Sequence, residues 1–88
     1  MSAAFDRAIR EILAERTRQD VRWGTIEQNP HRIHQWLALI REEWDEAFLS
    51  ADQDALQEVV QIAALCVACL EQHMPLKEQR SGSMRISA

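Results

Sequence analysis

Residues 52–73 read DQDALQEVVQIAALCVACLEQH, a segment without glycine or proline that is apolar on nearly every side of a helix. Its main apolar stripe is Leu56, Val60, Ala63, Val67 and Leu70. The opposite side carries Ile62, Leu65 and Cys69. We expect Asp52 to cap this helix and Met74-Pro75 to end it. A helix apolar on two sides must be covered twice, which predicts packing against its own chain and against a partner subunit.

Two further helices precede this segment. Apolar residues recur with helical spacing from about Ala3 to Arg22, and Trp23-Gly24 closes the run. Asn29-Pro30 has the form of an N-cap and first-turn pair, which predicts a second helix running to about Leu49. The expected inward stripe of this second helix is Ile33, Trp36, Leu37, Ile40, Trp44, Ala47 and Phe48.

The chain length and composition favour one all-α domain. Eighty-eight residues make a thin core, yet 47% of them are hydrophobic and three are tryptophan. We therefore expect an antiparallel bundle of three long helices, completed by assembly into a homodimer or homotetramer. Residues 76–88 form a short polar tail that we expect to be flexible or to hold one brief helix.

Charge and apolar run lengths restrict the partners. The formal net charge is −4, so bulk electrostatics would not attract a nucleic acid. The longest apolar stretch, from Ile62 to Leu70, is far shorter than the roughly 20 residues that cross a bilayer. Cys66 and Cys69 lack the further ligands that a zinc site requires, so we expect two core thiols in a reducing compartment. These features predict a cytoplasmic protein with neither a membrane nor a nucleic-acid partner.

Acidic residues fall on the apolar faces of two helices. Glu43 lies within the apolar stripe of the second helix, and Glu46 lies one turn further at its edge. Viewed down the axis of the third helix, Glu58 lies between Ile62 and Leu65, with Gln61 beside it one turn further along. In an antiparallel hairpin, each helix would thus contribute a pair of oxygen ligands three residues apart.

Three such acids held together need a counter-charge. Carboxylates about 5 Å apart repel by roughly 3 kcal/mol per pair at an effective dielectric constant of 20. Protonation or pairing with arginine would relieve this repulsion, but clustered oxygen ligands also suit Mg²⁺ or Mn²⁺. The alternative is that residues 42–46 form an ordinary solvated helix face.

The spacing of these acids resembles the signature of the all-α nucleoside triphosphate pyrophosphohydrolases, the MazG-like group. That signature is E-E-x-x-E followed by E-x-x-D, and the chain has Glu42-Glu43-Trp44-Asp45-Glu46 and then Glu58-Val59-Val60-Gln61. Glu15-Arg16, Gln19 and Trp23-Gly24 extend the resemblance over roughly residues 11–72. It implies hydrolysis of a nucleoside triphosphate between the α and β phosphates, which gives a monophosphate and pyrophosphate.

The resemblance also implies roles for individual residues. Glu43, Glu46 and Glu58 would be magnesium ligands, and Glu42 would orient or deprotonate the attacking water. Gln61 would occupy the place of the fourth ligand, which is normally an aspartate. An amide oxygen carries no charge, so Gln61 could weaken metal binding and leave a nucleotide-binding or sensing module without turnover.

Further residues are candidates for substrate contacts. Trp23 could stack on a base whose edge Gln19 could bond, although both could equally be ordinary packing or surface residues. His31 and His34 lie near the predicted start of the second helix, where the helix dipole favours a phosphate. Lys77 and Arg80 in the tail could also reach phosphate.

Other classes of protein remain open. A purely structural helical oligomer would respond to neither magnesium nor nucleotides. A carboxylate di-iron bundle would need Glu-x-x-His pairs, which neither Glu43 nor Glu58 forms.

Overall fold

The computed structural model describes residues 1–75, and its secondary structure is entirely helical within that part of the chain. The helices are α1 (Ala3–Trp23), α2 (Ile33–Phe48) and α3 (Asp52–His73). The prediction of an all-α protein with three long helices is therefore confirmed. The tail from residue 76, with Lys77 and Arg80, lies outside the described residues.

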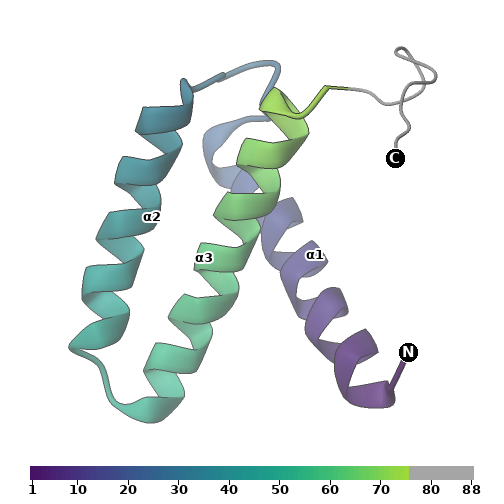
Figure 1. Cartoon of the computed structure of the whole chain (residues 1–88), viewed down its shortest axis with the longest axis vertical. Helices are drawn as coiled ribbons and strands as arrows, with labels where there is room; N and C mark the ends of the chain where they lie inside the picture. The colour runs from purple at the N-terminus through teal and green to yellow at the C-terminus, as the bar shows by residue number, and fades with distance from the viewer. Residues whose placement is uncertain (76–88) are drawn as a thin grey trace, which may run out of the picture.

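Helix α3 lies between the other two helices (Figure 1). It packs against α2 along an antiparallel pair and against α1 on another side, while α1 and α2 make no direct contact. The amphipathic pattern had predicted a partner subunit on the second side of α3, but α1 of the same chain covers part of that side. By length and mean hydropathy α3 could also cross a membrane, a test that the central helix of a soluble protein can pass as well.

The buried core is small and lies where α2 meets α3. It contains Trp36 from α2 and Ala64, Leu65 and Ala68 from α3. Ile26, Leu39, Ile40 and Cys69 pack partly buried against it. The two alanines have short side chains, which lets neighbouring groups approach the α3 backbone closely. The core therefore packs against the middle and the C-terminal half of α3.

Side-chain bonds fix the helices near the C-terminal end of α3. The Gln72 amide donates to the His31 carbonyl at 2.6 Å and accepts from the Trp36 indole at 3.1 Å. On the other side of α3, Arg16 of α1 donates to Glu71 at 2.8 Å. These contacts attach both α1 and the start of α2 to the last turns of α3.

The predicted start of α2 was wrong. The helix begins at Ile33, and the Gln35 side chain accepts from the backbone N–H of Arg32, the N-cap residue, at 2.7 Å. Asn29 instead closes a turn, because its N–H donates to the Thr25 carbonyl at 2.9 Å. Asp52 was likewise expected to cap α3 but is its first residue, where its charge favours the positive end of the helix dipole.

The predicted inward stripe of α2 is only partly buried within one chain. Trp36 is 6% exposed, but Leu37 is 50%, Trp44 is 59% and Phe48 is 79% exposed. Cys66, expected in the core, is exposed as well. The reason is geometric: α2 contacts only α3, so one chain covers only the side of α2 that faces α3. An extensive apolar surface is left on the outside of the chain.

Candidate metal centre and adjoining pocket

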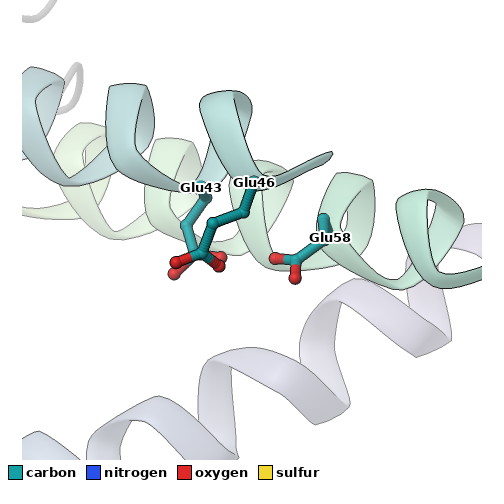
Figure 2. Close-up of side chains that lie close together, drawn as sticks. All are labelled: Glu43, Glu46 and Glu58. Carbon is teal, nitrogen blue, oxygen red and sulfur yellow. The ribbon is translucent and has the colours of Figure 1, made fainter. Parts of the chain in front are cut away.

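Three carboxylates from two helices converge at one end of the α2–α3 pair. Glu43 and Glu46 come from the second half of α2, and Glu58 comes from the first half of α3. One oxygen of each lies within 4.8 Å of the others, and Figure 2 shows the three side chains turned toward one another. We call these three residues the acid cluster. Its spacing suits oxygen ligands around a single divalent cation.

The local sequence explains this convergence. Glu43 and Glu46 are three residues apart, so they project from the same face of α2. Only residues 49–51 separate α2 from α3, so the end of α2 lies opposite the start of α3. Glu58 follows the first residue of α3 by almost two turns, which places it level with the final turns of α2.

Gln61 joins the acid cluster through its amide group. With that amide oriented to match donors with acceptors, its nitrogen donates to Oε1 of Glu43 at 2.8 Å and to Oε1 of Glu58 at 3.2 Å. Half a turn of the amide would present Oε1 to the same position. Gln61 therefore lies where a fourth ligand would be needed, although in this orientation it acts as a donor to the acids.

The environment of Glu43 favours its protonated form. A hydrogen bond with Glu58 is the largest cause, followed by burial and by the negative charges of Glu58, Glu46 and Glu42. Together they raise the pKa of Glu43 from 4.5 to about 7. Near neutral pH the acid cluster can therefore hold a proton, and a cation that binds there would displace it.

This pKa predicts how stability depends on pH. A carboxyl group whose pKa is higher in the folded state than in the unfolded state stabilises the fold most at pH values below its unfolded-state pKa. This contribution is lost as the pH rises through the folded-state pKa. In the presence of a chelator, the denaturant concentration at which half of the protein is unfolded should therefore decrease as the pH is raised from about 5 to about 8. Glu43→Gln should flatten this slope, whereas Asp45→Asn, an exposed neighbour, should leave it intact. Equal slopes for wild type and Glu43→Gln would contradict the assignment.

Glu42 lies beside the acid cluster rather than in it. Its side chain is exposed on α2, and its charge is the weakest of the influences that raise the pKa of Glu43. Its charge is near enough to influence Glu43, which is compatible with a carboxylate that acts on a water molecule beside the cluster. The role itself remains a prediction.

A pocket of about 260 Å³ lies between α1, residues 24–31 and the α2–α3 pair. We call it the Trp23 pocket. Its walls include Arg16, Gln19, Asp20, Trp23, His31 and Trp36. Of the substrate contacts suggested by the sequence, Gln19 and Trp23 line the pocket, whereas His34 is exposed and is not among the lining residues.

The ion pairs of Arg16 at this pocket, and the presence of Asp20 there, were not predicted from the sequence. Arg16 is only 7% exposed and binds Asp20 at 2.7 Å as well as Glu71 at 2.8 Å. These acids raise the pKa of Arg16, with the hydrogen bond to Glu71 as the largest cause. The four-residue spacing of Arg16 and Asp20 along α1 could have predicted the ion pair between them. The pairing with Glu71 joins residues 55 positions apart and needs the fold.

One short connection links the Trp23 pocket to the acid cluster. Gln19 is 4% exposed, and its amide nitrogen donates to the Gln61 carbonyl at 3.4 Å. The Gln61 side chain in turn contacts Glu43 and Glu58. A ligand that occupied the pocket would therefore lie next to the residue that contacts the acids.

Comparisons with known proteins leave this geometry as the basis for assigning a function. No protein-family model matches the sequence, and neither a curated protein nor a solved structure matches the chain.

Proposed function

We propose that the chain is a Mg²⁺-dependent nucleoside triphosphate pyrophosphohydrolase of the MazG-like kind. The observation that carries this proposal is the acid cluster, in which carboxylate oxygens of Glu43, Glu46 and Glu58 lie within 4.8 Å of one another. The raised pKa of Glu43 adds support, because it reports a site where negative charge is in excess. The acid motif shared with that group supplies the reaction type.

The residues fit the proposed chemistry. Mg²⁺ or Mn²⁺ at the acid cluster would neutralise the phosphate oxygens and the leaving pyrophosphate. Glu42 would accept a proton from a water molecule that attacks the α phosphorus. The bond from this phosphorus to the bridging oxygen would break, and pyrophosphate would leave with the bonding electrons. Gln19 and Trp23 would hold the nucleoside end in the adjoining pocket.

A second candidate function is a nucleotide-binding or sensing module without turnover. The specific observation in its favour is the Gln61 amide, which donates to Glu43 and Glu58 in the place where an acid would be expected. Such a protein would be stabilised by a triphosphate with magnesium but would release no product.

A product assay separates these functions. The purified chain is incubated with each common NTP and dNTP plus Mg²⁺ or Mn²⁺, and pyrophosphate and monophosphate are quantified. Both products in equal amounts would support the enzyme, and orthophosphate release would point to a different bond. Stabilisation without any product would favour the sensing module, and neither effect would leave a structural oligomer.

We also propose that the protein is a cytoplasmic homo-oligomer. The support is the apolar surface of α2, where Leu37, Trp44 and Phe48 are all at least 50% exposed. We expect sedimentation to give at least twice the 10.2 kDa mass of one chain. Trp44→Ser should shift the distribution toward monomer, whereas Glu11→Ser, an exposed change on α1, should not. A monomer at high micromolar concentration would contradict the proposal.

A further inference from the structure

We infer that the Trp23 pocket is selective for a guanine base and that Asp20 is the residue that determines this specificity. The inference rests on the proposed function, because it names the substrate class of the same site. It starts from the hydrogen-bonding groups that the pocket presents.

Several donors around the pocket already have acceptors within the chain, whereas the Trp23 indole N–H has none among the described residues. Arg16 uses its Nε and both terminal nitrogens on Glu71 and Asp20. The Trp36 indole donates to Gln72, and the Asn29 amide donates to the Trp23 carbonyl. These groups are committed to holding the walls of the pocket in place.

Three side-chain acceptor oxygens in the walls have no partner among the described residues. They are Oε1 of Gln19, whose nitrogen donates to Gln61, the second carboxylate oxygen of Asp20, whose first oxygen accepts from Arg16, and Oδ1 of Asn29. Gln19 is 4% exposed, so an unpaired oxygen there is costly and favours a ligand that can donate to it. The pocket thus favours a ligand rich in N–H groups.

The walls also restrict the shape of the ligand. The Trp36 ring is buried and lies 4.7 Å from the His31 ring between centroids. The Arg22 guanidinium lies over the Trp23 ring, 5.5 Å from the centroid of that ring. The His31 and Trp36 rings are tilted by 43° to each other, and the pocket volume of about 260 Å³, just under the usual range of about 300 to 1,000 Å³, has room for one heterocycle beside these aromatic side chains.

Among the common bases, only guanine places two donors side by side for a carboxylate. Its ring N–H and its 2-amino group can both point at Asp20. Uracil and thymine would bring carbonyl oxygens against the acid, and adenine and cytosine would bring an unprotonated ring nitrogen. Contacts between two hydrogen-bond acceptors in a partly buried pocket are unfavourable, so they lower the affinity for these other bases relative to guanine.

The test uses nucleosides, which lack the phosphates that the acid cluster would require. The full-length, metal-free protein is titrated with guanosine, inosine and uridine, and the indole N–H resonance of Trp23 is followed by NMR. Inosine is the matched probe because it lacks only the 2-amino group. Guanosine should bind at least about tenfold more tightly than either of the others, as expected for losing a hydrogen bond to a charged group.

Variants test the assignment to Asp20. Asp20→Asn should reduce the preference for guanosine over inosine to about twofold or less, while Arg16 keeps its bond to Glu71. Asp6→Asn, an exposed acid on the same helix, should keep the full preference. Should Asp20→Asn fail to fold, the wild-type comparison of guanosine with inosine still decides.

The outcomes for this inference and for the proposed function are separable. Equal binding of guanosine and inosine, equal binding of guanosine and uridine, or no binding of any of them would overturn the selectivity even if triphosphates are cleaved. A clear guanosine preference without release of pyrophosphate from GTP would keep the selectivity and overturn the enzyme.

Discussion

Replacing Glu58 with glutamine is expected to lower kcat/KM for pyrophosphate release by about 100- to 1,000-fold, and Glu43→Ala should do the same. This is the range seen when one group that stabilises charge in a transition state is removed. Glu58 lies in the acid cluster with Glu43 and Glu46, so its loss removes one of three carboxylates from the proposed metal ligands. The measurement is the rate of pyrophosphate formation at saturating Mg²⁺ with the best triphosphate.

The same substitution should have the opposite effect on the stability of the metal-free protein. Glu58 raises the pKa of Glu43 through a hydrogen bond and through its charge, so Glu58→Gln relieves repulsion in the acid cluster. Above about pH 7 in a chelator, the variant should unfold at a higher denaturant concentration than wild type. Asp45→Asn is the matched control, because Asp45 is exposed on α2 and is not part of the cluster.

Loss of activity together with a gain of stability is the signature of a functional acid cluster. An ordinary solvated face predicts neither change. Activity of Glu58→Gln within twofold of wild type would contradict the proposed metal centre, whatever its stability.

Leu65→Ala is expected to destabilise the fold by about 2 to 5 kcal/mol, the usual cost of deleting a large side chain from a packed core. Leu65 is 2% exposed, and the other described residues buried to this degree, Ala64 and Ala68, have much smaller side chains, so Leu65→Ala removes the largest completely buried apolar group. Domains of this size have only a few kcal/mol in reserve, so the variant should be largely unfolded at 25 °C.

The matched control for this variant lies on the same helix. Leu56 is 67% exposed, so Leu56→Ala removes the same atoms from a surface position and should change the free energy of unfolding by about 0.5 kcal/mol or less. Urea titrations followed by circular dichroism at low protein concentration measure both. Equal effects of the two substitutions would mean that the core is not where the structure places it.

Periodicity was sufficient to predict the three helices, because glycine and proline fall between strongly periodic segments. It failed at the start of α2, because Asn29 and Pro30 have the composition of a helix start while the turn from Thr25 to Asn29 competes for the same residues. It also failed for the α2 stripe. Periodicity shows which residues share a face, but not how much of that face a single neighbouring helix can cover.

The candidate site was also only partly predictable from the sequence. Glu43, Glu46 and Glu58 were predicted to converge, and the structure brings them together, because helix spacing and one short connection determine their positions. Their role as metal ligands remains a prediction. The Trp23 pocket needed the structure, since Arg16 pairs with Glu71 across 55 positions of sequence, and the connecting segment closes the pocket only in the folded chain.

Gln61 contacts both parts of the candidate site, the Trp23 pocket and the acid cluster. Its backbone carbonyl holds Gln19 of α1, while its side chain holds the acids of α2 and α3. Because α1 and α2 meet only through α3, a slip of α3 by a single residue would misalign both sets of partners together. The pocket and the acid cluster therefore share one mechanical reference, the axial position of α3, and any change that shifts this helix along its axis alters both sites at once.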